Sequence, residues 1–274
     1  MTTTLRPTGP IHRAADGARS RTYQVCVNSR PVGATELATH AVFGPSVGEI
    51  RSLVIDERDR RRGRATVAAL AAEEVLRGWG CTRVEAKVPA DATAALSLAT
   101  ALGYIERNRR MAKRLAAGPP ALPRGSTWRP MTDAEFDAWL ARAKVTYAQT
   151  WIERGVPEEQ AHIKSETDHA RLLPNGKATP GTWLSTLTHE GVDVGTLWLA
   201  VRDEEPFVFD VRVEEEFRGH GHGRSLMLLA ERQAREAGAD ELGLNVFAGK
   251  TPALRLYESL GYRPVTYFLY KPLL

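Results

Sequence analysis

Short runs of apolar and β-branched residues alternate with turn-forming residues through the C-terminal half of this 274-residue chain. Such runs are typical of strands. They span residues 182–188, 192–202, 206–213, 242–247 and 264–271. After residue 223, apolar side chains recur at helical spacing, which predicts an amphipathic helix, and 251–260 predicts a shorter one. This order of strands and helices indicates a mixed α/β domain.

Two helices are expected before these strands. Thr132 is followed three residues later by Glu135, a capping-box pattern that predicts a helix start. Pro157 suits the first turn of a second helix, because its missing N–H has no partner there in any case.

The N-terminal half has the same order of elements without the two opening helices. It predicts strands at 22–28, 49–55, 82–88 and 105–113, with helices after residue 65 and at 93–101. Two landmarks repeat at one spacing of 158 residues. Arg60-Arg-Arg-Gly-Arg-Ala65 precedes Arg218-Gly-His-Gly-His-Gly223, and Leu102-Gly-Tyr104 precedes Leu260-Gly-Tyr262. The chain therefore contains two copies of one module.

Proline and glycine place the boundaries between the copies. Residues 116–127 contain three prolines and two glycines without periodicity and are expected to be a linker. Residues 1–20 lack apolar periodicity and are expected to be a flexible tail. The predicted domains are therefore 21–115 and 128–274.

Composition narrows the class of protein only a little. A hydrophobic content of 43% allows a core in each half, and the net charge of +4 suits an anionic ligand without indicating nucleic acid. No apolar run is long enough to span a membrane, and residues 1–20 lack the apolar core of a secretory signal. Cys26 and Cys81 are expected to be reduced, buried thiols, so we expect a cytoplasmic protein.

The segment 218–223 lies between a strand and a helix and suits an anion. The first N–H groups of a helix are unpaired and carry partial positive charge, and glycine lets a phosphate approach the backbone. A P-loop would need a lysine directly after Gly223, where Arg224 stands. A dinucleotide fingerprint would need a third glycine and an acid on the next strand, where Asn245 stands.

A third motif fits better. The R-x-x-G-x-G segment after the third strand, together with Ala253-Leu-Arg-Leu-Tyr-Glu-Ser-Leu-Gly-Tyr262, resembles the GNAT N-acetyltransferase superfamily. The resemblance covers 128–274 and, less closely, 22–115. It implies two tandem GNAT folds of the α/β (α+β) class, each with a mixed, mostly antiparallel sheet flanked by helices. It also implies acetyl-CoA as co-substrate, no metal, and a primary amine of a small molecule or peptide as acceptor.

The resemblance assigns roles to residues of the C-terminal copy. For the cofactor these are Val211, Val213, Arg218, Gly219, His220, Gly221, His222, Gly223, Arg224 and Asn245. Tyr257 stands where the family places the acid that protonates the departing thiolate, and Asp210 is the preferred base for the amine. His169 and Glu166 are weaker alternatives for the base. Lys250 departs from the family, which often has asparagine there.

The N-terminal copy keeps part of this set. Its possible cofactor residues are Leu53, Ile55, Arg60, Gly63 and Ala65. Ala99 stands in the place of Tyr257, Ser52 in that of Asp210 and Lys87 in that of Asn245. We therefore expect catalysis in the C-terminal copy, beside an N-terminal copy that is structural or holds CoA without turning it over.

Three other interpretations of these residues compete with an acetyltransferase. A non-enzymatic acyl-CoA-binding or regulatory module would keep the loop but need no acid or base. The histidine pair His220 and His222 has metal-ligand spacing, but no carboxylates or cysteines gather nearby in the sequence, so no metal is expected. The basic run 58–64 lacks interleaved aromatic residues and coincides with the phosphate loop, so no nucleic-acid partner is expected either.

Overall fold

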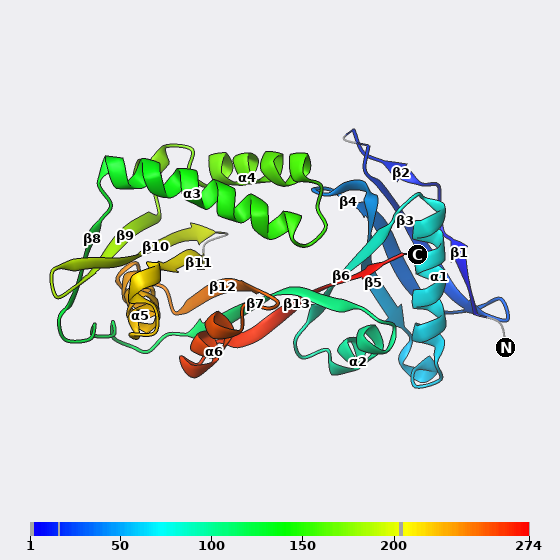
Figure 1. Ribbon diagram of the computed structural model, residues 1–274. Helices are drawn as coiled ribbons and strands as arrows, with labels where there is room; N and C mark the ends of the chain where they lie inside the picture. The colour runs from blue at the N-terminus through cyan, green and yellow to red at the C-terminus, as the bar shows by residue number, and fades with distance from the viewer. Residues whose placement is uncertain (1–2, 16, 203–204, 274) are drawn as a thin grey trace. The chain divides into compact units, whose positions relative to one another are not determined.

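The computed structural model describes residues 3–15, 17–202 and 205–273 (Figure 1). The chain divides into two compact units. Unit 1 comprises residues 1–108 together with 266–274, and unit 2 comprises 109–265. Each unit is a mixed α/β fold, and its strands are described below as they follow one another within that unit.

The sheet of unit 1 is antiparallel except at one pair. In order, its strands are β1 (Thr3–Pro7), β3 (Arg19–Val27), β4 (Arg30–His40), β5 (Gly44–Ile55), β6 (Arg83–Pro89) and part of β13 (Arg263–Pro272), with β2 (His12–Arg13) beside β3. Among its described strand pairs, β5 and β6 run parallel. Helix α1 (Arg64–Gly78) packs on β1, β4 and β5, and α2 (Thr93–Ala101) follows β6.

The expectation of a flexible N-terminal tail is wrong for the residues that the structure describes. Thr3–Pro7 pairs antiparallel with β3, from Thr3 opposite Val27 to Pro7 opposite Tyr23. Leu5 packs against the apolar side chains under α1. An edge strand with a single apolar residue carries almost no period-two signal, which explains why the pattern failed there.

Unit 2 repeats this sheet and adds a layer of helices. Its strands follow the order part of β7 (Ile105–Arg114), β12 (Glu241–Phe247), β11 (Glu205–Val213), β10 (Val192–Arg202), β9 (Thr182–His189) and β8 (Ser126–Pro130). Among the described strand pairs of this unit, β11 and β12 run parallel. Helix α5 (His222–Glu236) covers one face, where Leu226 and Leu229 pack on Leu197 and Leu199.

Two opening helices cover the other face of unit 2. They are α3 (Asp133–Ile152) and α4 (Glu158–Leu172), which pack on each other. The expected capping box is confirmed, because the Glu135 N–H donates to Thr132 Oγ1 and the Thr132 N–H donates to Glu135 Oε2 at 2.7 Å. The expected linker is shorter than predicted at its end, because β8 begins at Ser126.

Backbone geometry confirms that the two copies correspond at the spacing found in the sequence. Tyr104 N–H donates to the Ala99 carbonyl and Tyr262 N–H donates to the Tyr257 carbonyl, both at 3.0 Å. Each bond closes a helix, α2 or α6 (Thr251–Ser259), through a glycine with positive φ. Ala99 and Tyr257 therefore occupy the same place in the two copies.

The last strand of each copy belongs to the unit built mainly from the other copy. Leu115 N–H donates to the Asp240 carbonyl in unit 2, and Leu273 N–H donates to the Thr82 carbonyl in unit 1, both at 2.8 Å. The side chains repeat the exchange. Lys113 pairs with buried Glu231 at 2.7 Å, and Lys271 pairs with buried Glu73 at 2.6 Å.

This exchange divides the chain differently from the domains expected at 21–115 and 128–274. Residues 109–115 lie in unit 2 and residues 266–274 lie in unit 1.

Cys26 and Cys81 are buried and form no disulfide, as expected. None of the helices in the described part of the chain combines the length and apolarity that a membrane span requires.

Candidate functional site

The two parallel strands of unit 2 separate at the place where the site is expected. Their pairing runs only from Phe207 opposite Gly243 to Val208 opposite Leu244, although β11 continues to Val213. Diverging strands leave backbone groups that an extended ligand can pair with, as an added strand would. The opening leads towards the loop that joins β11 to α5.

That loop has the backbone conformation that the sequence predicts. Gly219 has φ +83° and Gly221 has φ +86°, and Gly221 is the N-cap of α5. A Cβ at either position would meet no other atom within 4 Å, so both glycines border open space at the helix N-terminus. The conformation favours glycine, and the open space suits a phosphate group.

Gly223 is glycine for a different reason. A Cβ there would lie 3.2 Å from Leu256 Cδ2 and 3.9 Å from Val213 Cγ2, so a side chain would press on α6 and β11. The third small residue of the motif thus lets α5 lie close to α6 and to the end of β11. This close packing also fixes the position of α5 relative to Tyr257, one residue after Leu256.

The basic side chains of the loop surround the helix N-terminus. Arg218 donates from Nε to the Val213 carbonyl at 3.4 Å, and Arg224 donates to Ser259 Oγ at 2.7 Å. The ring of His222 lies 5.0 Å from that of His189 and 6.3 Å from that of His220. Burial, with help from these two neighbours, lowers the pKa of His222, which would rise again beside a bound anion.

Asp210, on β11 beyond its last pair with β12, interacts electrostatically with Tyr257 of α6. Burial raises the pKa of the Asp210 carboxyl, and Trp139 donates to this carboxylate from Nε1 at 3.2 Å. Burial raises the pKa of Tyr257 to about 12, and the charge of Asp210 contributes to the rise. The phenol therefore keeps its proton near neutral pH, while the carboxylate is a stronger base than an exposed aspartate.

The two weaker candidates for the base, His169 and Glu166, lie in different surroundings. His169 is buried and stacks on Trp198 with ring centroids 5.7 Å apart, and its charge affects the pKa of Asp210. Glu166 is exposed and pairs with Lys144 at 2.5 Å. The structure thus brings His169 to the Asp210 region and leaves Glu166 on the surface of α4.

The remaining expected residues lie at the edges of the opening. Asn245 is an exposed residue of β12, just past the last paired residue. Lys250 is exposed at the N-cap of α6. Trp139 is the residue that sequence reasoning missed. Its spacing from Phe136 and Ala143 marks the apolar face of α3, but no sequence signal shows that its indole N–H meets Asp210.

Unit 1 keeps the loop geometry with different chemistry. Gly63 has φ +70° and is the N-cap of α1, and Arg61 adopts φ +59° where unit 2 has Gly219. Arg60 donates to the Ile55 carbonyl at 2.9 Å, as Arg218 does to Val213. Leu53 and Ala65 are partly buried against the core, and Ile55 is buried within it.

Buried Asp59 alters the charge of the unit 1 loop. It accepts two hydrogen bonds from Arg30, at 2.8 and 3.0 Å, and also pairs with Arg64, the first residue of α1. Phe217 stands at the corresponding position of unit 2. Asp59 therefore offsets part of the positive charge near the N-terminus of α1.

Unit 1 also lacks the acid and base pair. Ser52 lies opposite Glu36 in the sheet register, as Asp210 lies opposite Trp198, and Ala99 is the counterpart of Tyr257. In the part of the chain that the structure describes, no three histidine, cysteine or acidic side chains gather in a way that would hold a metal ion.

The comparisons with known proteins agree with this fold. The model of the "Acetyltransferase (GNAT) family" matches twice, over residues 4–104 and 139–262. The chain belongs to the GNAT acetyltransferase family and carries two copies of its domain.

Individual relatives match one copy or both. An uncharacterized N-acetyltransferase of Bacillus subtilis, YdgE, is 32% identical over 138 residues, 48% of this chain and 88% of its own length. A mycothiol acetyltransferase of Clavibacter sepedonicus is 27% identical over 259 residues, 91% of this chain and 79% of its own length. A GCN5-related N-acetyltransferase from Sphaerobacter thermophilus has a similar fold, with a TM-score of 0.54 and 20% identity over 92% of this chain and 80% of that one.

Proposed function

We propose that the protein is an N-acetyltransferase that moves an acetyl group from acetyl-CoA directly to a primary amine of a small molecule or peptide. Catalysis is assigned to unit 2. The observation that carries this proposal is the presence in unit 2 of a buried phenol, Tyr257, whose pKa responds to the charge of Asp210, a carboxylate on β11 just beyond its last pair with β12. Neither group has a counterpart in unit 1.

The residues of unit 2 fit acetyl-CoA. The N-terminus of α5, with Gly219, Gly221, Arg218 and Arg224, would hold the pyrophosphate. Backbone groups of Val211 and Val213, together with the exposed Asn245, would contact the pantetheine arm. Acetyl-CoA supplies the thioester, whose C–S bond breaks as the C–N bond to the amine forms.

Two proton transfers accompany that exchange. Asp210, oriented by the Trp139 indole, takes a proton from the amine directly or through one water, and the raised pKa of its carboxyl brings its basicity closer to that task. Tyr257 gives its phenolic proton to the departing thiolate. Its pKa of about 12 keeps the proton available at neutral pH.

The test replaces Tyr257 by phenylalanine. We expect kcat to fall by about 100-fold, because general acid catalysis commonly contributes that much, while KM for acetyl-CoA changes by less than about twofold. Release of free thiol with a panel of amines measures both. Tyr262→Phe is the matched control, since its ring lies 6.1 Å from that of Tyr257 and it has no role in the proposed chemistry. Equal turnover by Tyr257→Phe and the wild type would remove the acid role.

The alternative is a non-enzymatic acyl-CoA-binding or regulatory module. The same panel separates the two, because the alternative requires acetyl-CoA binding by calorimetry without thiol release for any amine. The presence of α3 and α4 over the Asp210 side of the sheet favours the enzyme, because a module that only binds the cofactor has no use for an acceptor side.

A further inference from the structure

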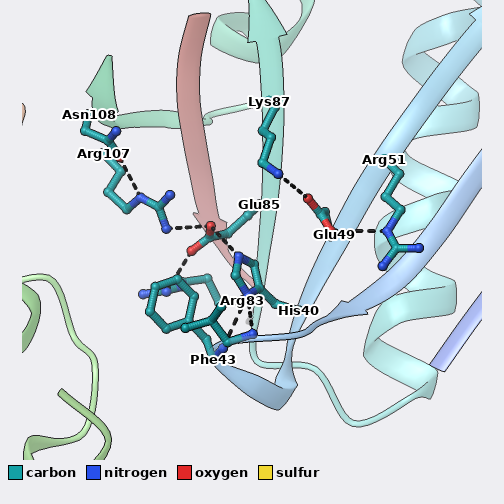
Figure 2. A network of polar contacts seen from close by, with 10 residues as sticks. His40, Phe43, Glu49, Arg51, Arg83, Glu85, Lys87, Arg107 and Asn108 are labelled. Carbon is teal, nitrogen blue, oxygen red and sulfur yellow. Dashed lines mark hydrogen bonds and ion pairs between the residues drawn. The ribbon is translucent and has the colours of Figure 1, made fainter. Parts of the chain in front are cut away.

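Unit 1 contains a hollow of about 400 Å³ that the proposed chemistry does not use. It is lined by the β4–β5 hairpin and β6, through His40, residues 41–42, Glu49, Ile50, Arg51 and Lys87. Pockets that bind small molecules commonly have volumes of a few hundred Å³. Figure 2 shows most of these side chains and the contacts that join them.

The hollow lies on the sheet face that corresponds to the aromatic face of unit 2. A bulge at Arg51 in unit 1 matches one at Phe209 in unit 2, which fixes the correspondence of residues on this face. In unit 2, Phe209 stacks on Trp198 at 4.7 Å and lies 5.0 Å from Phe207. Arg51 replaces Phe209 in unit 1 and pairs with the counterparts of those rings, Glu36 at 3.1 Å and Glu49 at 3.3 Å.

Unit 1 has charged side chains on the sheet face that α3 and α4 cover in unit 2. In unit 2, Trp139 of α3 and His169 of α4 pack on Trp198 and keep the rings buried. The described residues of unit 1 form no counterpart of α3 and α4, so apolar rings there would remain exposed within that unit. An ion-paired face removes that penalty and leaves a polar hollow.

Basic and acidic side chains form a polar network around the hollow. Its basic members are Arg51, Arg83, Lys87 and Arg107, and its acidic members are Glu36, Glu49 and Glu85. Arg83 and Arg107 each donate a hydrogen bond of 2.7 Å to the buried carboxylate of Glu85. One carboxylate thus pairs with two guanidinium groups. In the lining itself, Arg51 and Lys87 stand against a single carboxylate, Glu49, so an anion in the hollow would meet more positive than negative charge.

Lys87 is the cation best placed to meet such an anion. Its side chain is 60% exposed, and among the described contacts its ammonium group has only one ion pair, with Glu49 at 3.5 Å. That distance is too long for a hydrogen bond with good geometry, so the N–H donors of Lys87 are open to a ligand. Arg51 lines the hollow beside it and adds positive charge there, while its Nε and Nη1 groups donate to Glu49 and Glu36.

His40 stays neutral at the side of the hollow. Its Nδ1 accepts the backbone N–H groups of Val42, at 3.1 Å, and Phe43, at 3.3 Å, which leaves the ring proton on Nε2, 3.8 Å from Glu85 Oε2. Burial lowers the pKa of His40 to about 4, with Arg107, Lys87 and Arg83 lowering it further and Glu49 opposing them. A nearby anion would raise this pKa, so the ring reports on occupancy.

We propose that the hollow of unit 1 is a binding site for a small carboxylate, held by the Lys87 ammonium group with the Arg51 guanidinium beside it. The site is separate from the phosphate loop at Gly63 and uses none of the residues assigned to acetyl transfer. It gives the copy without an acid and base a ligand of its own. The proposal therefore stands whether or not unit 2 is an enzyme.

Nuclear magnetic resonance on the full chain tests the proposal with acetate as the probe and acetamide as its neutral isostere, at constant ionic strength. We expect saturable shifts of the Ala41, Val42 and Ile50 amides with acetate and none with acetamide. The imidazole of His40, assigned with His40→Gln, should become more protonated at about pH 5 when acetate binds. Absence of saturable shifts, or equal shifts with acetamide, would overturn the proposal.

Two variants test the charges in opposite directions. Lys87→Met should weaken acetate binding by about tenfold, and Glu49→Gln should strengthen it, because it removes the one carboxylate that lines the hollow. A purely structural network predicts no gain from Glu49→Gln. Lys144→Met, which removes an ion-paired lysine of unit 2, is the matched control and should leave the shifts unchanged. Inorganic phosphate as a second probe distinguishes a carboxylate site from a general anion site, and tighter binding of phosphate than acetate would contradict the assignment to carboxylates.

Discussion

Asp210 combines a functional role with a cost in stability. Burial raises the pKa of its carboxyl in the folded protein above the value in the unfolded chain. The folded state then binds more protons than the unfolded state between the two pKa values, so stability decreases as pH rises through that window. At neutral pH the ionised group therefore destabilises the fold.

We expect Asp210→Asn to reduce kcat by about 100-fold or more and to raise Tm at pH 7. Asparagine can still accept the Trp139 hydrogen bond, so the fold should not change around it. The gain in Tm should disappear below about pH 4, where the aspartate itself is protonated. Calorimetry at the two pH values and a pH–rate profile check this, and an unchanged acidic limb of the profile would exclude Asp210 as the base.

Asp59 changes the charge beside the Gly63 loop of unit 1. It holds Arg30 and Arg64, which would otherwise lie near the N-terminus of α1 as free cations. We expect the Gly63 loop to bind CoA more weakly than the Gly221 loop for this reason. The wild type should then show one strong site per chain by calorimetry.

The effect of Asp59 can be isolated in a chain whose unit 2 loop is blocked. Gly221→Val places a β-branched residue at φ +86° in the anion cradle and should abolish the strong site. Adding Asp59→Asn should then increase the remaining CoA affinity by about tenfold. If the double variant binds no better than Gly221→Val alone, Asp59 does not control the unit 1 loop.

At the scale of elements, the helices and central strands were readable because their periodicity is local. The capping box at Thr132 and the glycine turn at Gly221 each depend on a few neighbouring residues, and both are confirmed. The strand Thr3–Pro7 was missed because Leu5 is its one apolar residue in a sheet-edge position. The contact between Trp139 and Asp210 joins residues 71 apart in sequence, and local patterns do not contain it.

The exchange of the last strands could not be predicted for a different reason. β7 and β13 are repeats of one strand, so their sequence pattern is the same whichever sheet they join. The choice depends on the chain between them and on partners such as Glu73 and Glu231, which are themselves equivalent by repeat. A sequence repeat identifies the element but leaves its partner open.

At the scale of the whole molecule, the reciprocal ion pairs make the exchange testable. Glu231→Lys places two ammonium groups together in a mostly buried position and should destabilise the protein by about 3 kcal/mol or more. Adding Lys113→Glu should restore most of the lost Tm, whereas adding Lys271→Glu should not. Restoration by Lys271→Glu instead would show that the last strands are not exchanged in solution.

The position of β13 also affects the order in which the protein is made. Domains usually fold in sequence as the chain leaves the ribosome, with the N-terminal one first. Unit 1 cannot follow that order, because β6 has to wait for residues 266–272, which follow nearly the whole of unit 2. During synthesis β6 is therefore left with an open edge that a second nascent chain could pair with, and the first unit to begin emerging is the last to be completed.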